Sequence, residues 1–216
     1  MSSTNRGGQR RPDDFYRTPR WAVEALLNSM GGLPPGVILE PGCGDGAILK
    51  VLADYDTRGA NYFVGVEQNA ERAHVALEHC DRLLVEDFLK ADVSDVHAVA
   101  VIGNPPYRDA EAFVRQSLKA VLHGGRVHLL LRLAFLAGQR RARSGLWENL
   151  KEVRILSKRP SFTETGTDSA DYAWVTWERP LPGIDTARQV LSMWILPPEP
   201  AGAGHVSQQV VGSAHE

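Results

Sequence analysis

Cysteine is scarce in this sequence, and no apolar run is long. The 216 residues include two cysteines, Cys43 and Cys80, too few for a disulfide framework and not arranged as a Cys-x-x-Cys pair. The longest apolar stretch, 127–138, has about twelve residues and includes His128 and Arg132, so it is too short to span a membrane. No apolar segment typical of a signal peptide follows Met1. We therefore expect a reduced, cytoplasmic protein with no membrane contact.

Metal-binding and hydrolase patterns are missing as well. The seven histidines are scattered, and the pairs His74/His79 and His123/His128 are five residues apart, not the four of a helical metal pair. The spacing assembles no Ser-His-Asp or Cys-His set. We expect no metal site and no nucleophilic side chain.

The composition is that of one globular domain with two tails. Hydrophobic residues make up 43% and charged residues 23%, enough apolar material for a core. Residues 1–14 are polar and rich in Gly and Arg, and we expect a flexible basic arm there. Residues 15–196 carry the periodic patterns of a domain. Residues 197–216 are rich in Pro, Gly, Ala and Ser, which predicts a disordered tail.

Charge is distributed unevenly although its sum is only −2. Residues 37–100 hold 12 acidic and five basic side chains, whereas 132–159 hold eight basic and two acidic ones. Residues 1–20 add five arginines against two aspartates. Basic segments on either side of an acidic middle favour a protein that meets a polyanion on one face, although solvated faces that cluster by chance would give the same pattern.

Short apolar segments alternate with helical patterns along the domain. Strands are expected at 37–40, 61–67, 82–86, 98–103, 126–133, 153–157 and 171–178, with 189–196 as an optional further one. Helices are expected at 47–53, 70–80 and 110–122, the last closed by Gly124-Gly125, and in the basic stretch after 133. This alternation predicts an α/β fold, a mostly parallel sheet with helices on both faces. Ligands of such sheets bind at the carboxyl ends of the strands.

A glycine-rich loop follows the first strand, in the stretch Glu40-Pro41-Gly42-Cys43-Gly44-Asp45-Gly46. Its spacing is neither the G-x-G-x-x-G dinucleotide pattern nor a phosphate loop. Glu67 ends the second strand, where a carboxylate can accept from two ribose hydroxyls. Asp87 and Phe88 follow the third strand, and an acid beside an aromatic ring suits an adenine. A tight glycine turn with solvent-facing acids is the alternative.

These residues resemble the motifs of class I S-adenosylmethionine (SAM)-dependent methyltransferases. The resemblance implies a Rossmann-like fold, a mostly parallel seven-stranded sheet with one antiparallel strand, over 15–196. It implies SAM as the cofactor, bound by the first motif, a ribose-binding acid and an adenine-binding pair. The positions that match are Glu40, Pro41, Gly42, Gly44, Gly46, Glu67, Asp87 and Phe88.

The fourth strand ends in Asn104-Pro105-Pro106-Tyr107, a tetrapeptide rare by chance. The Asn104 side-chain oxygen and the Pro105 carbonyl can each accept one hydrogen of a conjugated amine, which localises the nitrogen lone pair toward a methyl donor. Two prolines hold that carbonyl in place. Tyr107 offers a ring for a planar substrate. A rigid turn with a packed tyrosine is the structural alternative.

This tetrapeptide, with Asn104 also beside the cofactor, is similar to that of amino-methyltransferases acting on adenine N6 or on protein glutamine amides. Tyr16-x-Thr18-Pro19 resembles a segment that packs on the cofactor in DNA adenine methyltransferases. Read locally, it is a helix start with Thr18 as N-cap and Pro19 in the first turn.

Basic and aromatic residues beyond the fifth strand are candidates for nucleic-acid contacts. They are Arg132, Arg140, Arg141, Arg143, Lys158, Arg159 and Phe162; Phe162 could equally be core. Together the segments resemble adenine methyltransferases encoded by phages and prophages. The resemblance implies methylation of adenine N6 in DNA, with the base flipped out of the stack.

No separate target-recognition region follows Arg159, so low or very short sequence specificity is expected. RNA adenine methylation, protein glutamine methylation and a non-catalytic SAM- or nucleic-acid-binding module remain open. The oligomeric state is not defined by the sequence, and a monomer is favoured.

Overall fold

The computed structural model describes residues 16–162, 169–183 and 191–197. The expected basic arm at 1–14 and, apart from Pro197, the expected tail at 197–216 lie outside these residues. Within them no helix is long and apolar enough to cross a bilayer.

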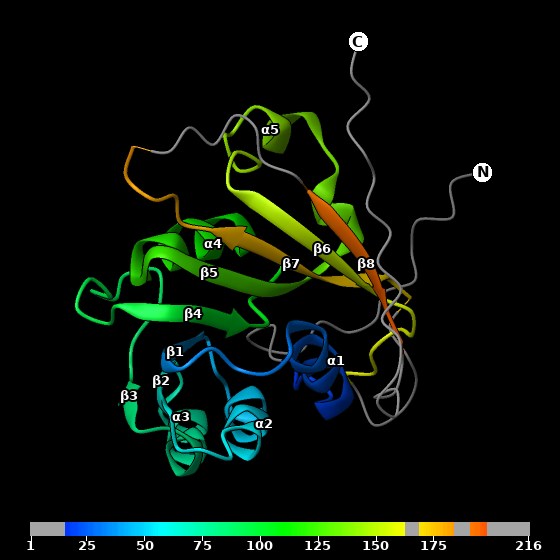
Figure 1. Ribbon diagram of the computed structural model, residues 1–216. Coiled ribbons are helices and arrows are strands. Elements are labelled where there is room, and N and C mark those ends of the chain that lie inside the picture. The colour runs from blue at the N-terminus through cyan, green and yellow to red at the C-terminus, as the bar shows by residue number, and fades with distance from the viewer. Residues whose placement is uncertain (1–15, 163–168, 184–190, 198–216) are drawn as a thin grey trace.

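The described residues form one eight-stranded sheet in the order β3-β2-β1-β4-β5-β7-β6-β8 (Figure 1). The strands from β3 to β5 are parallel, β7 is antiparallel to both β5 and β6, and β8 pairs with β6 in parallel. The strands are β1 (Gly36–Pro41), β2 (Asn61–Val66), β3 (Arg82–Leu84), β4 (Ala98–Gly103), β5 (Val121–Arg132), β6 (Leu150–Leu156), β7 (Tyr172–Glu178) and β8 (Ser192–Leu196). The expected number of seven strands is wrong, because the optional strand near 189–196 exists as β8 and extends the sheet past β6.

Helix α1 precedes β1, helices connect β1 to β2, β2 to β3 and β4 to β5, and short helices follow β5. They are α1 (Arg20–Met30), α2 (Ala47–Tyr55), α3 (Ala70–Ala76), η2 (Leu77–His79), α4 (Ala110–Ala120), η3 (Leu133–Leu136) and α5 (Gln139–Ala142). The single helix expected at 70–80 is divided between α3 and η2, and the basic helical stretch is reduced to the four residues of α5.

Gly124-Gly125 does not end a helix, contrary to the expectation from sequence. The helix α4 ends at Ala120, and Val121 already pairs with Ala98 of β4. Gly124 has a φ of +82° and its N–H donates to the Arg179 carbonyl at 2.8 Å. The two glycines thus shape the irregular start of β5, because pairing with a neighbouring strand overrides the local stop signal.

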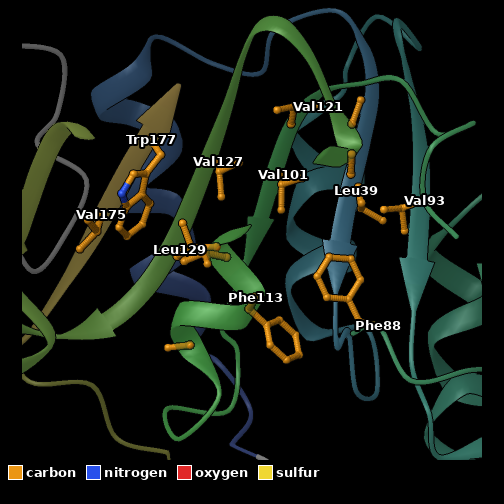
Figure 2. Close-up of a cluster of buried hydrophobic side chains, with 14 of the residues drawn as sticks. Leu39, Phe88, Val93, Val101, Phe113, Val121, Val127, Leu129, Val175 and Trp177 are labelled. Atoms are coloured by element: carbon orange, nitrogen blue, oxygen red, sulfur yellow. The ribbon is translucent and has the colours of Figure 1, made fainter. Parts of the chain in front are cut away.

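Alternation along the central strands divides the core into two clusters. Leu39 and Val101 belong to the cluster that includes Phe113 of α4, part of which Figure 2 shows. Their neighbours Ile38 and Ile102 belong to the other cluster, to which α1 and α2 contribute. Successive strand side chains point to opposite faces, so the clusters lie on opposite sides of the sheet. Trp177 and Trp174 are likewise divided between the clusters, and both are fully buried as packing residues.

Candidate active site

A cavity of about 330 Å³ lies where β1, β2 and β4 end. Nine of the predicted site residues line it: Tyr16, Thr18, Glu40, Gly42, Glu67, Asp87, Phe88, Asn104 and Pro106. Six others of the same motifs do not line it: Pro19, Pro41, Gly44, Gly46, Pro105 and Tyr107. Tyr107 instead lines an adjoining hollow of about 280 Å³, together with Phe135 and Arg141. The motifs are therefore brought to one edge of the sheet, as the topology requires, and their individual roles stay predictions.

The glycine loop turns the chain from β1 into α2. Gly46 is the N-cap of α2 with a φ of +79°, and a Cβ there would lie 2.9 Å from Ala76 Cα. Gly42 has a φ of +64° and lines the cavity, where a Cβ would approach Phe113 to 3.5 Å. The positive φ favours glycine at both positions, and at Gly46 the close approach of Ala76 also excludes a Cβ.

Glu67 connects the glycine loop to the start of α3. Its Oε2 accepts from the Gly44 N–H at 2.9 Å, and its Oε1 accepts from the Asn69 N–H at 2.8 Å. Arg72 Nη2 lies 3.4 Å from the same Oε1. The carboxylate is 5% exposed and lines the cavity. Oε1 uses both of its lone pairs on Asn69 and Arg72, whereas Oε2 keeps one beyond Gly44, so Glu67 can still accept from a ligand through Oε2.

The glycine-rich stretch itself contributes two further acids. Glu40 is buried and accepts from the Leu49 N–H at 3.1 Å, and burial raises its pKa well above the usual range. Asp45 Oδ2 pairs with Arg17 Nε at 3.2 Å, while its buried Oδ1 has no partner among the described residues. Both acids line the cavity. A buried carboxylate oxygen without a partner favours a cationic or hydrogen-bond-donating ligand.

Asp87 and Phe88 lie in the connection that follows β3. Asp87 accepts from the Leu89 N–H at 3.0 Å, and this bond, with Lys90 at 3.1 Å, lowers the pKa of the carboxyl group. Phe88 is 3% exposed and packs against Phe113 with ring centroids 5.1 Å apart. Phe88 therefore belongs to the core and to the cavity wall at once.

Asn104 is held in one orientation by three neighbours. Its Nδ2 donates to the Tyr16 carbonyl at 3.3 Å and to Thr18 Oγ1 at 3.1 Å. Its Oδ1 accepts from the Tyr107 hydroxyl at 3.1 Å. Because a backbone carbonyl can only accept, the amide nitrogen must face Tyr16, and both of its hydrogens are used. The remaining lone pair of Oδ1 is what this side chain can offer to a substrate amine.

The contact with Asn104 also corrects the expectation for Thr18 and Pro19. Helix α1 begins at Arg20, Pro19 is its N-cap in extended conformation, and no side chain caps it. Thr18 is 6% exposed and turned toward Asn104. The tertiary contact takes the hydroxyl that a local N-cap would have used.

Aromatic rings surround Asn104. The Tyr16 and Tyr107 rings are stacked at 15° with centroids 6.3 Å apart, and Phe162 meets Tyr16 edge-on at 5.8 Å. Tyr172, buried in β7, lies 5.6 Å from Tyr107 and 5.2 Å from Phe162. Phe162 is 6% exposed, so it is a packed member of this cluster rather than an exposed ring. Sequence reasoning did not assign Tyr172 a role at the site.

The predicted nucleic-acid contacts divide into two kinds. Arg132 lies over the Tyr107 ring at 5.0 Å and donates to the Tyr172 hydroxyl at 3.1 Å. Arg141 donates to the carbonyls of Phe135 and Ala137, each at 3.0 Å. These two guanidiniums support the walls around Tyr107.

The other predicted cations lie at the surface. Arg143 and Lys158 are exposed, and Lys158 lies over the Trp21 ring at 5.8 Å. Arg159 is exposed and pairs with Asp171 at 2.7 Å. Arg140 belongs to α5, and its side chain lies outside the described part of the structure.

Several cavity residues were missed from the sequence: Arg17, Asp45, Ile48, Gln68, Arg72, Arg108 and Phe113. Asp45 stands inside the glycine loop, and that position was a usable signal. The others reach the cavity from the segment before α1, from α2, from α3 and the residues before it, and from α4 and the turn before it, and only the packing of these segments decides that. The described residues contain no group of three or more His, Cys, Asp or Glu side chains able to hold a metal ion.

Comparison with known proteins bears on the fold. No protein-family model matches the sequence, and no curated protein does. A protein from Listeria monocytogenes, assigned to the class I S-adenosylmethionine-dependent methyltransferases, superposes with a TM-score of 0.67 at 18% identity. The matched region covers 83% of this chain and 65% of that one. The fold is Rossmann-like, as in these methyltransferases.

Two further solved structures have the same fold and carry different assignments. The methyltransferase subunit of a type I restriction-modification system from Streptococcus thermophilus has a TM-score of 0.62 at 13% identity, over 83% of this chain and 47% of that one. A Pyrococcus horikoshii protein assigned as an RNA methyltransferase also gives 0.62, at 17% identity, over 82% of this chain and 92% of that one. The chain thus spans about half the restriction-modification subunit and about two thirds of the Listeria protein.

The charge of the cavity fits SAM. Its lining holds six carboxyl groups against three guanidiniums, and SAM carries a net positive charge from its sulfonium and ammonium groups. The acids are Glu40, Asp45, Glu67, Glu86, Asp87 and Asp109. The cavity volume of about 330 Å³ lies within the range of small-molecule sites.

Proposed function

We propose that this protein transfers a methyl group from SAM to the N6 amine of adenine in DNA. The observation that carries the proposal is the fixed orientation of Asn104. Its amide hydrogens are bound by Tyr16 and Thr18, its Oδ1 keeps one lone pair beyond the Tyr107 hydroxyl, and the residue lines an acidic cavity. A conjugated amine placed at that oxygen stands beside the proposed cofactor.

The cofactor would lie in the cavity at the ends of β1, β2 and β4. Glu67 would accept from a ribose hydroxyl through Oε2, and Asp87 and Phe88 would hold the adenine of the cofactor. Asp45 would favour its positive charge. When bound, SAM supplies an electrophilic methyl group on a good leaving group, so the protein needs to align the acceptor rather than activate a nucleophilic side chain.

The residues of the Asn104–Tyr107 segment would bind and orient the substrate amine. Asn104 Oδ1 and the Pro105 carbonyl would accept one amine hydrogen each, and the nitrogen lone pair would then point away from the base plane toward the methyl group. Tyr107 would stack on the base, a contact worth about 1–3 kcal/mol. The Tyr107 hydroxyl also holds Asn104 at 3.1 Å, so one residue supports both the base and its acceptor.

A nucleic-acid substrate is supported by the cations beyond β5 and by the fold. Arg143, Lys158 and Arg159 are exposed, and an exposed cation can neutralise a DNA phosphate. The same fold occurs in a restriction-modification methyltransferase subunit. We propose DNA on this basis, with low or very short sequence specificity and with the target base flipped into the site.

Nucleoside mass spectrometry tests the proposal. Purified protein and SAM are incubated separately with unmethylated duplex DNA, single-stranded DNA and total RNA, and the digested nucleosides are quantified. We expect N6-methyldeoxyadenosine with wild type, its loss in Asn104→Ala, and its retention in Asn28→Ala, which replaces an exposed asparagine of α1. Sequencing of the methylated sites measures the specificity.

The other outcomes point to other functions. N6-methyladenosine found only in RNA would identify an RNA methyltransferase instead. One of the solved structures with this fold carries that assignment. SAM binding by calorimetry with no methylated nucleoside in any pool would contradict a nucleic-acid substrate. Methylated glutamine in a peptide substrate would then identify a protein methyltransferase, and its absence a binding module.

A further inference from the structure

A second and larger cavity lies away from the candidate active site. Its volume is about 760 Å³, and it shares no lining residue with the first cavity. It opens between the connection from α1 to β1 and the strands β4, β5, β6 and β8. The proposed methyl transfer uses none of its residues.

One side of this cavity is apolar. Met30, Leu33, Pro34 and Pro35 line it from the end of α1 and the connection to β1. Val99 of β4, Leu122 of β5 and the Trp194 indole of β8 also line it. This composition suits a flat apolar group of a ligand.

The sheet side of the cavity carries buried charge. Arg154 of β6 is 4% exposed, contacts Glu152 and donates through Nη1 to Thr176 Oγ1 at 3.2 Å. The same hydroxyl bonds His128 Nδ1 at 2.9 Å. Arg126 Nη1 lies 3.5 Å from Glu152 Oε1. Arg126, Arg154 and Glu152 line the cavity and give it one net positive charge, the histidines counted as neutral.

Two donors of this cavity lack partners. Neither Arg154 Nε nor Trp194 Nε1 has a hydrogen-bond partner within the described part of the chain, although both atoms are buried. Arg154 and Trp194 are paired across β6 and β8, so the two donors come from adjacent positions of the sheet. A buried N–H without an acceptor costs free energy, and a ligand that supplies an acceptor recovers it.

We propose that this cavity binds a small organic anion. A carboxylate or phosphate group would accept from Arg154 Nε and Trp194 Nε1, and the attached aromatic ring would lie against the apolar side at Leu33 and Pro34. The two sources that share this chemistry are aryl carboxylates and nucleoside monophosphates. The site is independent of the proposed methyl transfer.

Titrations followed by protein NMR test the proposal, because the indole N–H signal of Trp194 reports on this cavity. The probes are benzoate with benzamide as its neutral counterpart, uridine monophosphate with uridine, and inorganic phosphate alone. We expect a saturable shift of the Trp194 signal with benzoate, with uridine monophosphate or with both. The indoles of Trp174 and Trp177 donate to the carbonyls of Ala22 and Leu146, so their signals should stay in place.

The pattern of shifts separates the outcomes. A response to benzoate alone identifies an aryl carboxylate, and a response to uridine monophosphate alone identifies a nucleotide. No movement of the Trp194 signal with either anion would overturn the proposal. An equal response to benzamide or uridine would also overturn it, because binding would then not need the negative charge. An equal response to inorganic phosphate would overturn it as well, because binding would then not need the ring.

Variants give a second measurement by calorimetry. Arg154→Gln should weaken binding of the responding anion about tenfold or more, because a hydrogen bond to a charged group is lost. Trp194→Phe keeps the ring and removes only the donor, and it should weaken binding about three- to tenfold. Arg58→Gln, an exposed arginine in the turn before β2, is the charge-matched control and should bind like wild type. If Arg154→Gln does not fold, Trp194→Phe alone decides, and wild-type affinity in that variant contradicts the proposal.

Discussion

The Thr18 hydroxyl accepts a hydrogen bond from Asn104 Nδ2 at 3.1 Å, across 86 positions of the sequence. Together with the Tyr16 carbonyl it uses both hydrogens of the amide. The segment before α1 thereby sets the direction in which Asn104 Oδ1 points. Thr18 is a positioning residue under this assignment, since it acts on a substrate only through Asn104.

Replacement of this hydroxyl should slow the reaction without removing the cofactor site. Thr18→Val keeps the shape of the side chain and removes one hydrogen bond, worth about 0.5–1.5 kcal/mol. We expect kcat to fall about three- to tenfold, with the KM for SAM changed less than kcat. Steady-state kinetics of Thr18→Val beside Thr57→Val, an exposed threonine, measures this. A rise in KM for SAM with kcat unchanged would instead assign Thr18 to cofactor binding.

Two variants of Tyr107 separate its ring from its hydroxyl. Tyr107→Phe loses the bond to Asn104 Oδ1 and should lower kcat about three- to tenfold. Tyr107→Ala also loses the ring, and stacking is worth about 1–3 kcal/mol per base, so a further loss of about five- to hundredfold is expected. Single-turnover methylation with saturating SAM compares the two. Equal rates for the two variants would exclude a stacking role.

Glu67 should be needed for cofactor binding and for the conformation of the loop. In the wild type, the N–H groups of Gly44 and Asn69 lie 2.9 and 2.8 Å from the two carboxylate oxygens of Glu67. In Glu67→Gln one of these oxygens becomes an NH2 group, which cannot accept a hydrogen bond. We expect SAM affinity by calorimetry to fall about tenfold or more, and Tm to fall as well. Glu71→Gln, an exposed glutamate of α3, is the matched control. Wild-type affinity in Glu67→Gln would show that the carboxylate does not contact the cofactor.

The structure separates two arginines of the basic stretch. Arg143 is exposed, so Arg143→Gln should weaken DNA binding and reduce the salt slope by about 1. Arg141 binds the carbonyls of Phe135 and Ala137, so Arg141→Gln should lower Tm. Binding titrations at several salt concentrations and thermal unfolding of both variants test this. A lower Tm in Arg143→Gln with an unchanged salt slope would contradict the assignment of Arg143 to DNA binding.

His128 should make the protein sensitive to acid. Burial, with the positive charges of Arg154 and Arg126, lowers the pKa of His128 from 6.5 to about 3, so the folded protein holds the ring neutral. The unfolded chain takes up a proton below pH 6.5, which favours unfolding. The contribution of His128 is therefore complete above pH 6.5 and is lost as the pH falls toward 3, by about 1.4 kcal/mol per unit at most.

Denaturant unfolding between pH 7 and 4 measures this dependence. His128→Gln cannot titrate, so its free energy of unfolding should fall less steeply with acid than that of wild type. His74→Gln removes an exposed histidine of α3 and should keep the wild-type slope. Parallel curves for wild type and His128→Gln would show that His128 has the same pKa in the folded protein as in the unfolded chain.

Local patterns predicted most of the elements. β4 has the expected bounds, and β1, β2, β7, α2 and α4 differ from expectation by a few residues at their ends. The start of β5 was missed because Val121 pairs with Ala98, a contact that no local signal contains. The optional strand near 189–196 depended in the same way on an available edge, which β6 provides.

The order of strands and helices could be predicted without coordinates, as could the positions of Glu40–Gly46, Glu67, Asp87 and Asn104–Tyr107 after strands. Short-range periodicity and glycine conformation carry that information. The directions in which those side chains face depend instead on contacts between distant segments. The bond from Asn104 to Thr18, the packing of Phe162 against Tyr172, the internal use of Arg132 and Arg141, and the buried cluster around Arg154 all join distant segments. Such contacts depend on how the sheet brings distant strands together, so local sequence patterns do not predict them.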